Sequence, residues 1–146
     1  MTYLFRQNSV CQDTIAAHFA ACEPAFVLAL REQTDIDLYS EKIIRLARCF
    51  EAWEQEKLIG LVAAYYNQDA STAYITNVSV LPMYQSQNVG SQLITLCIDA
   101  LTLAGAKEIA LDVAVDNTRA KQFYIKHAFI PQGINGLRLH MIRYGD

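Results

Sequence analysis

The chain of 146 residues lacks the features that mark a membrane protein or a secreted protein. Apolar residues make up 53% of the chain, but they come in short broken runs. None of these runs reaches the roughly 18 residues that a membrane-spanning helix needs. The first residues, Met1 to Arg6, do not have the basic-then-apolar layout of a signal peptide. We therefore expect a cytoplasmic protein that has no membrane partner.

Metal-ligand and disulfide patterns are missing as well. The cysteines form no CxxC pair and have no histidine at the spacing of a zinc site, and the histidines are scattered. The residues concerned are Cys11, Cys22, Cys49, Cys97, His18, His127 and His140. Buried, reduced thiols and no bound metal are the expectation.

The chain also has no strong excess of one sign of charge. The net charge is −3, and acidic and basic residues are interspersed. The densest basic stretch, Lys42 to Arg48, is spaced by apolar residues and is typical of a solvated helix face. No basic stripe with interleaved aromatics is present, so we expect no nucleic-acid partner. The length suits one domain over residues 1–146 with a single substantial core.

Hydrophobic periodicity and turn residues predict a mixture of strands and helices. Strands are expected at 3–6, 50–54, 58–66, 72–80, 109–115, near Phe129 and at 137–144, with a loop at 133–136. Helices are expected from Asp13, from Pro24 for a further turn to Leu30, from Asp37 or Ser40 to about Arg48, at 90–104 before Gly105, and at 118–127 after Asn117. The order β-α-α-β-β-β-α-β-α-β-β predicts an α/β (α+β) fold whose sheet carries helices on both faces.

The most informative stretch is residues 78–93, VSVLPMYQSQNVGSQL. A strand ends at Pro82, a small polar loop follows, and a helix opens at Val89 and Gly90. This order brings free backbone N–H groups and the positive end of a helix dipole to one point, which is how a protein holds a diphosphate without lysines. By itself the pattern fits an ordinary strand-turn-helix connection equally well.

The same stretch resembles the acyl-CoA diphosphate loop of the GNAT family of N-acetyltransferases, written Gln/Arg-x-x-Gly-x-Gly/Ala. Gln85, Asn88 and Gly90 stand at its three fixed positions. Asn88 replaces the usual glycine, and asparagine is one of the few other residues that adopt the left-handed backbone readily.

A second stretch, residues 111–129, resembles the family's Asn-x-x-Ala-x-x-Phe/Leu-Tyr-x-x-x-Gly-Phe signature. Asn117, Ala120, Phe123, Tyr124 and Phe129 match it, and an alanine at 128 replaces the glycine. Two motifs in the right order are far more specific than one, and the resemblance covers roughly residues 37–130. It implies a GNAT-like mixed, mostly antiparallel sheet flanked by helices.

The resemblance implies acetyl-CoA as co-substrate. The third strand of the sheet should diverge from its neighbour, so that the backbone of Val78 and Val80 pairs with the pantetheine arm as a missing strand would. A β-bulge near Asn77 would free such groups and could direct an N–H at the thioester oxygen. The cofactor-binding residues implied are Val78, Val80, Gln85, Gln87, Asn88, Val89, Gly90, Ser91, Asn117 and Phe123.

The resemblance also implies catalytic residues. A tyrosine at the position of Tyr124 would protonate the leaving thiolate, because the pKa of a phenol lies near that of a thiol. Asp112 is a candidate base for the amine, directly or through water. Either side chain could instead be structural: Tyr124 as a half-buried aromatic, and Asp112 as an outward or capping residue. The other candidate bases are Glu23, Glu32 and Glu54, whereas Asn77, where some relatives carry a catalytic glutamate, cannot take a proton.

The acceptor site of the family is usually built from the first two helices and the last hairpin loop, here about residues 22–40 and 131–138. Carboxylates in the first segment could attract a cationic amine. They are Glu23, Glu32, Asp35 and Asp37, with Tyr39 beside them. Sugar amines, small metabolite amines and a protein N-terminus all remain open as acceptors.

Two functional hypotheses follow from the resemblance. The first is an enzyme that moves an acetyl group from acetyl-CoA directly to a primary amine of a small molecule or peptide. The second is a non-catalytic acyl-CoA-binding regulator on the same fold. Retention of Tyr124 favours the enzyme. A homodimer is among the assemblies that we expect.

Overall fold

The computed structural model describes residues 3–145. The strands are β1 (Leu4–Gln7), β2 (Arg48–Glu54), β3 (Lys57–Asn67), β4 (Thr72–Val80), β5 (Glu108–Ala114), β6 (Ile130–Asn135) and β7 (Arg138–Tyr144). The helices are α1 (Gln12–Ala20), α2 (Pro24–Gln33), α3 (Ile36–Leu46), α4 (Val89–Ala104) and α5 (Thr118–Lys126), with a 3₁₀ turn, η1 (Pro82–Tyr84).

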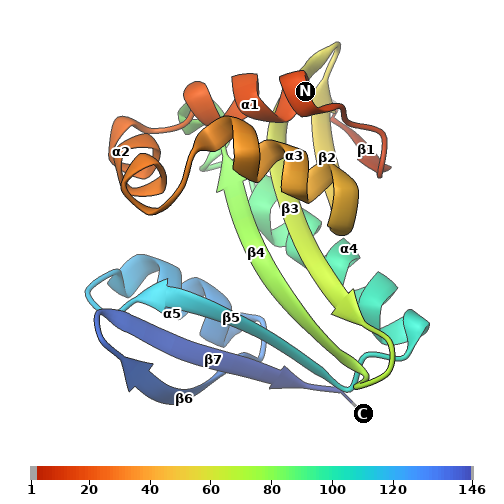
Figure 1. Cartoon of the computed structure of the whole chain (residues 1–146), viewed down its shortest axis with the longest axis vertical. Coiled ribbons are helices and arrows are strands. Elements are labelled where there is room, and N and C mark those ends of the chain that lie inside the picture. Colours follow the sequence, from red (N-terminus) through yellow and green to blue (C-terminus); the bar gives the residue numbers. More distant parts are fainter. Residues whose placement is uncertain (1–2, 146) are drawn as a thin grey trace.

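The seven strands form one mixed sheet in the order β1-β2-β3-β4-β5-β7-β6 (Figure 1). All neighbouring pairs are antiparallel except β4 and β5, which are parallel. The parallel pair needs a crossover connection, and α4 supplies it. The mixed, mostly antiparallel sheet that the sequence predicted is therefore confirmed.

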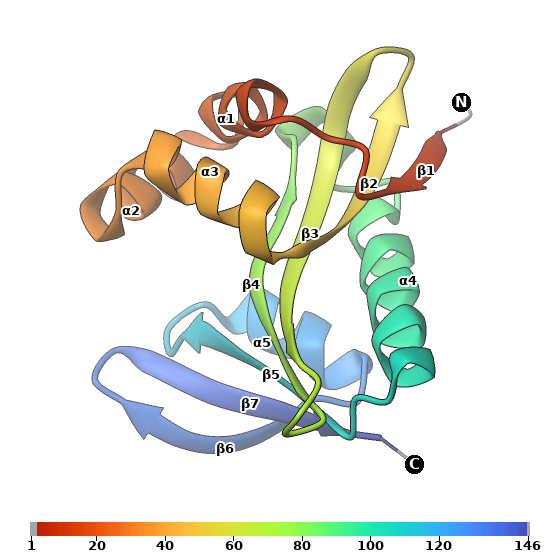
Figure 2. The same cartoon turned by 45° about the vertical axis from the view of Figure 1, so that its right-hand side comes forward.

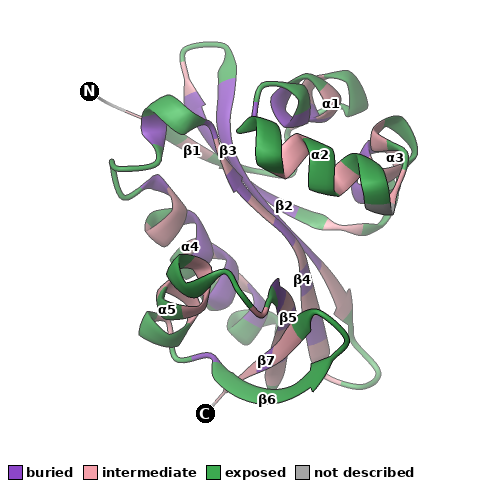
Figure 3. Cartoon of the chain, turned by 90° about the vertical axis from the view of Figure 1, so that its left-hand side faces the viewer, coloured by how far each residue is buried: buried purple, intermediate pink, exposed green. Residues whose placement is uncertain are grey.

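Helices cover both faces of the sheet, as expected (Figure 2). On one face α4 packs against β2, β3 and β4 through a cluster that includes Leu93, Cys97 and Leu101. On the other face α1 and α3 pack against β2 and β3, and Phe19 and Ile43 are fully buried there. Strands in the middle of the sheet are therefore buried on both sides, whereas β6 is exposed along its length (Figure 3).

The divergence of β4 from β5 is the feature of the fold that positions the site. The two strands pair only where Thr72–Tyr74 lies beside Glu108–Ala110, and they separate beyond this point (Figure 1). A register shift in the β3–β4 ladder adds one residue, Thr76, between the pairs Ala63–Asn77 and Ala64–Ile75. Both the divergence and the predicted bulge near Asn77 are thus present, and the bulge bends β4 away from its parallel neighbour.

Several helix boundaries differ from the prediction. The N-cap of α3 is Asp35, whose carboxylate accepts from the backbone N–H groups of Asp37 and Leu38, so neither Asp37 nor Ser40 caps this helix. Asp13 lies in the first turn of α1 and is not its cap, because Cys11 holds that position without a side-chain hydrogen bond.

The prediction also understated two elements. The stretch from Pro24, predicted as one further turn, is a full helix, because proline preorganises its first turn and no breaker follows before Thr34. Gly133 lies within β6 rather than in a loop, because the hairpin turn needs only the residues between Asn135 and Arg138. The glycine-containing strand therefore forms a longer hairpin than the sequence indicated.

Three of the cysteines, Cys22, Cys49 and Cys97, are buried free thiols as expected, whereas Cys11 is exposed. Within residues 3–145 no single helix is long and apolar enough to cross a membrane. The pair α1 and α2, bent by 119°, meets the length and composition test only when both are taken together.

Candidate active site

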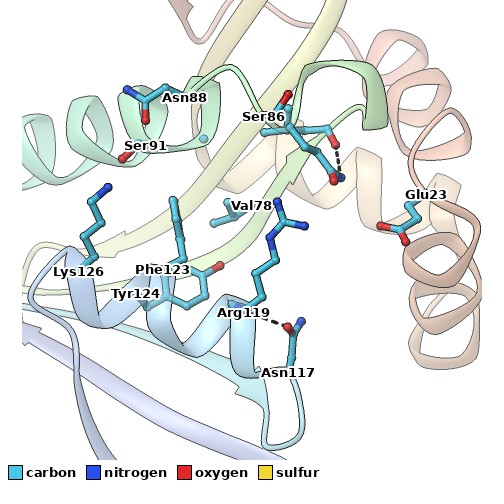
Figure 4. A pocket seen from close by; sticks show the side chains of 14 residues that line it. Glu23, Val78, Ser86, Asn88, Ser91, Asn117, Arg119, Phe123, Tyr124 and Lys126 are labelled. Carbon is cyan, nitrogen blue, oxygen red and sulfur yellow. Dashed lines mark hydrogen bonds between the residues drawn. The ribbon is translucent and has the colours of Figure 1, made fainter.

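A groove of about 540 Å³ opens where β4 has left β5. Its walls are the end of β4, the loop after η1, the first turn of α4, and one face of α5 (Figure 4). Eight of the predicted cofactor-binding residues line it together: Val78, Val80, Gln85, Asn88, Gly90, Ser91, Asn117 and Phe123.

The first turn of α4 has the form that the loop motif indicated. Asn88 has φ 65° and ψ 16°, in the left-handed region, and its side chain makes no capping hydrogen bond. The asparagine thus takes the backbone conformation of the family glycine. Gly90 is the next fixed position, and a Cβ there would sit 3.6 Å from Val80 Cγ2 and 3.7 Å from Phe123 Cζ. Since both neighbours line the groove, the missing side chain keeps its floor open.

The edge of β4 beyond its pairing with β5 is held by two side chains. The Tyr39 hydroxyl donates to the carbonyl oxygen of Thr76 at 2.8 Å, and Gln85 Nε2 donates to that of Val80 at 3.2 Å. Val78 lies between these two positions and lines the groove. The strand is therefore kept extended at the place where the resemblance implies a pantetheine arm.

Two predicted residues do not line the groove. The Val89 side chain is fully buried, and its Cγ1 would lie 3.1 Å from a Cβ placed on Gly60, so it packs into the sheet under α4. Gln87 is exposed, and its amide reaches back to the carbonyl of Met83 at 3.5 Å. Any contact of Val89 with a ligand would have to come from its backbone, because its side chain is occupied by the core.

Sequence reasoning missed the two cations of the groove. Arg119 and Lys126 project into it from α5 (Figure 4), and Glu23, at the N-terminal end of α2, lines its other side. Arg119, Phe123 and Lys126 are spaced i, i+4 and i+7, so they share one helix face. That spacing could have identified both cations once Phe123 was placed in the site.

A second pocket of about 590 Å³ adjoins the groove. It lies where the resemblance implied an acceptor site, between α2, α3, the free part of β4 and the β6–β7 hairpin. Its lining is mostly apolar and aromatic, with one carboxylate and one guanidinium: Phe26, Ala29, Leu30, Thr34, Tyr39, Tyr74, Thr76, Asn77, Val78, Asp112, Ala114, Tyr124, Leu137 and Arg138.

The acidic mouth that the first segment suggested is not formed at this pocket. Of the residues considered for it, only Tyr39 lines the second pocket. Asp35 caps α3, and Glu23 faces the groove instead. The carboxylate in the pocket is that of Asp112 from β5.

Tyr124 and Val78 line both cavities, so the two meet at these residues. Tyr124 lies on α5, and its ring packs edge-on against Phe123 and Phe129. Burial raises the pKa of the Tyr124 hydroxyl to about 12, so this group stays protonated at neutral pH. A residue with a protonated hydroxyl thus lies at the junction, with its ring held by packing.

Asp112 lies in the second pocket within a short hydrogen-bond network. The Tyr74 hydroxyl donates to Asp112 Oδ2 at 2.6 Å, and His140 Nδ1 lies 3.0 Å from Oδ1. Burial raises the pKa of Asp112, but the hydrogen bonds from Tyr74 and His140 and the nearby charge of Arg138 outweigh it, so the pKa lies below its ordinary value. The carboxylate is therefore ionised at neutral pH.

Asn77 also lines the second pocket, and its amide is oriented by buried partners. Its Nδ2 donates to the carbonyl of Leu61 at 3.2 Å and to Ser79 Oγ at 2.9 Å, and Ser79 in turn lies 2.9 Å from His18 Nε2. Burial lowers the pKa of His18, which is consistent with a neutral ring. The amide nitrogen faces inward, so the oxygen is the end left for the pocket.

Two of the other candidate bases lie outside both cavities. Glu54 accepts from the Tyr84 hydroxyl at 2.6 Å and lines neither cavity, and Glu32 lines neither as well. Over residues 3–145, no group of three or more histidine, cysteine, aspartate or glutamate side chains is placed to hold a metal ion.

Comparison with known proteins agrees with this geometry. Residues 13–129 match the family model described as acetyltransferase (GNAT) family. Because the match covers most of the chain, this protein belongs to the GNAT acetyltransferase family.

The individual relatives share only part of this chain and less than a third of its residues over that part. The chain is 29% identical over 84 residues to the N-alpha-acetyltransferase MAK3 of Arabidopsis thaliana, covering 56% of this chain and 44% of that one. It is also 29% identical over 83 residues to N-alpha-acetyltransferase 30 of Schizosaccharomyces pombe, covering 55% of each. The chain spans about half the length of the curated relatives it matches.

The fold has full-length counterparts among solved structures. The PaiA N-acetyltransferase from Thermoplasma acidophilum, solved in complex with coenzyme A, matches with a TM-score of 0.83 and covers 99% of this chain and 100% of that one. The sequence identity is 17%, so this likeness concerns the fold alone.

Proposed function

We propose that this protein is an N-acetyltransferase that moves an acetyl group from acetyl-CoA directly to a primary amine. The observation that carries the proposal is the junction of the two cavities at Val78 and Tyr124. A ligand in the groove and a ligand in the second pocket would meet there, beside a hydroxyl and across from a carboxylate. Such an arrangement brings two reactants together, which is a large part of what a transferase must do.

The groove suits acetyl-CoA in three respects. The first turn of α4 offers backbone N–H groups and the positive end of a helix dipole to a diphosphate. Arg119 and Lys126 add positive charge to the same wall. The edge of β4 at Val78 has no β5 neighbour, which leaves backbone groups for a pantetheine arm. Acetyl-CoA, when bound there, supplies the acetyl group as an activated thioester.

The proposed transfer moves three protons. An amine that enters as an ammonium must lose one proton before it can attack, and Asp112, which lines the second pocket, would receive it directly or through water. The new C–N bond forms as the C–S bond breaks, the thiolate takes a proton from the Tyr124 hydroxyl, and the acylated nitrogen gives its second proton back to the Tyr124 oxygen. The products are the amide, the CoA thiol and one proton that leaves through Asp112. Burial raises the pKa of Tyr124 to about 12, which keeps its proton in place at neutral pH and makes the hydroxyl a weaker acid than an ordinary phenol.

The lowered pKa of Asp112 indicates which role this carboxylate would have toward the amine. A carboxylate that is ionised and hydrogen-bonded by Tyr74 and His140 is a weak base but a good partner for an ammonium. Asp112 would thus hold the charged amine first and accept the proton as the amine attacks.

The acceptor we propose to test first is the α-amine of a peptide. The two curated relatives are named as N-alpha-acetyltransferases, and the second pocket combines one carboxylate with apolar walls. An N-terminal ammonium could pair with Asp112 while the first side chain contacts Phe26, Leu30 or Leu137. Sugar amines and small metabolite amines belong in the same panel.

The proposal is tested by thiol release from acetyl-CoA with a panel of peptide α-amines, amino sugars and diamines, followed by mass spectrometry of the product. A mass gain of one acetyl group on the amine nitrogen, dependent on the protein, supports the proposal. Tight binding of CoA with no acceptor acetylated in any class would instead favour the regulator. Absence of CoA binding would defeat both readings.

A further inference from the structure

A histidine at an unspecified position of the second motif contacts the proposed diphosphate site. His127 Nε2 lies 2.7 Å from the hydroxyl oxygen of Ser91. Ser91 is the third residue of α4 and lines the groove, whereas His127 is the C-cap residue of α5. The two helices are thus joined by one hydrogen bond at the place where we propose that phosphates bind.

The surroundings of His127 disfavour the protonated form of its ring. Its ring lies 4.9 Å from that of Phe123, which also lines the groove. Burial lowers the pKa of His127, and the positive charges of Lys126 on its own helix and Arg143 on β7 lower it further. These are the charged groups that act on the ring in the free protein, and both oppose its protonation.

The protonation state of His127 decides what Ser91 presents to the groove. When a neutral ring accepts through Nε2, the Ser91 hydroxyl donates its only hydrogen bond to the histidine. Its oxygen lone pairs then face the groove. When the ring is protonated, Nε2 can only donate, so Ser91 accepts from it and its own proton is released. The released O–H can then donate to an anion, which is the stronger kind of hydrogen bond.

We infer that His127 is a positioning residue of the diphosphate site, which when protonated turns the Ser91 hydroxyl proton toward the phosphates and adds positive charge behind it. This inference rests on the proposed function, because it requires that CoA occupies the groove. It adds a residue whose identity neither motif specifies, and it makes the affinity for the phosphates depend on pH.

The sign of the dependence follows from linkage. If the protonated ring favours the phosphates, the bound phosphates must favour protonation of His127 by the same factor. Affinity should therefore rise as the pH falls through the pKa of His127 in the complex, and the gain should be absent at high pH. For charges separated by a hydroxyl group in a partly solvated site, we expect an effect of about three- to tenfold.

The test uses dephospho-CoA as the probe. The 3′-phosphate of CoA is a monoester that titrates near pH ~6 and would add its own pH dependence, whereas the diphosphate of dephospho-CoA does not titrate between pH 5.5 and 8. Isothermal titration calorimetry across this range should show tighter binding by the wild type at low pH. Circular dichroism at each pH checks that the protein stays folded.

His127→Gln is the matched variant, because glutamine can still hydrogen-bond Ser91 but carries no titrating charge. It should bind dephospho-CoA with nearly constant affinity across the range. His140→Gln removes the histidine that contacts Asp112 and serves to assign its resonance in the titration below. If the wild type and His127→Gln show the same pH profile, the inference is overturned while the binding site stands.

A second readout follows the ring itself. The histidine resonances, assigned by the two variants, are titrated by NMR with and without dephospho-CoA, and the pKa of His127 should rise when the ligand is bound. An unchanged His127 titration in the presence of bound ligand would overturn the inference. Failure of both CoA and dephospho-CoA to bind at millimolar concentration would overturn the proposed function, and the inference with it.

Discussion

Tyr124 is the residue with the clearest expected phenotype. Tyr124→Phe keeps the ring that packs against Phe123 and Phe129 and removes only the hydroxyl. Loss of a general acid typically costs roughly 10² to 10⁴ in rate. We therefore expect turnover of an identified amine to fall in that range while acetyl-CoA affinity barely changes, as measured by steady-state kinetics and calorimetry.

Two other outcomes for Tyr124→Phe would change its assignment. Unchanged turnover would remove the hydroxyl from the mechanism. An equal loss of turnover and acetyl-CoA affinity would make Tyr124 a binding residue, which its place in the wall of both cavities also permits.

The proposed role of Asp112 is tested by the pH dependence of the reaction rate. Asp112→Asn removes the charge that we propose holds the ammonium and takes its proton. The variant should lose most activity at a pH where the amine is still protonated, and raising the pH should recover part of the rate by supplying neutral amine. A pH–rate profile of both proteins measures this, and a small loss that is uniform across pH would make Asp112 structural.

Stability provides a control for Asp112. Its pKa is lowered in the folded protein, so the ionised carboxylate stabilises the fold above its unfolded pKa, and this contribution is lost as the pH falls through the folded pKa. Denaturant unfolding should therefore show Asp112→Asn to be less stable near neutral pH, with the difference shrinking in acid. The catalytic loss, in contrast, should be largest where the amine is protonated.

At the scale of elements, a variant in the first turn of α4 can show whether the backbone conformation or the side chain of Asn88 matters for CoA binding. Asn88 is left-handed and its side chain makes no capping hydrogen bond. Asn88→Gly should therefore keep or improve CoA affinity, because glycine adopts this conformation without strain. Calorimetry with CoA measures it, and a large loss of affinity would show that the asparagine amide itself contacts the ligand.

Gly90 tests the next fixed position of the same turn. The added Cβ of Gly90→Ala would meet Val80 and Phe123 at ordinary contact distances, and alanine favours a helix over glycine by about 0.5–1 kcal/mol. The variant should thus be at least as stable as the wild type in thermal unfolding. Its CoA affinity in calorimetry should stay near that of the wild type, because the loop motif accepts alanine at this position. A large loss of affinity would show that the ligand approaches α4 too closely for a methyl group.

At the scale of the whole molecule, CoA should stabilise the fold. The groove is built from β4, α4 and α5, so a ligand that bridges them binds only the folded chain. At a concentration ~100-fold above Kd the stabilisation should be about 2.7 kcal/mol, seen as a higher unfolding temperature in calorimetry. Pantetheine, which lacks the diphosphate, is the matched control and should stabilise less. Equal shifts would argue against the phosphate site at α4.

Other expectations about the whole molecule remain predictions. A single domain over residues 1–146, a homodimer and a cytoplasmic location were inferred from length, resemblance and composition. Size-exclusion chromatography with light scattering tests the dimer directly, and a monomer at micromolar concentration would exclude it under those conditions.

The sequence by itself determined most of the elements and the two motifs, because both depend on local chemistry. The strand at Thr72–Val80 and the cap at Asn117, whose side chain accepts from Ala120 N–H, follow from periodicity and nearby polar groups. The left-handed Asn88 follows from the loop motif, and Gly105 ends α4 in a left-handed conformation as predicted. Local hydrogen bonding and backbone sterics decide such features, so they can be read from neighbouring residues.

Only the tertiary structure decided which side chains share a cavity. The hydrogen bonds of the Ser91–His127 pair and of the Tyr74–Asp112–His140 network join residues up to 38 positions apart along the chain, and the groove brings Arg119 and Lys126 together with β4 and α4. The same packing buried the Val89 side chain, which the motif alone would assign to the ligand. These contacts exist because β4 diverges from β5 and α5 closes over the opening, and no local pattern encodes how two distant elements come together.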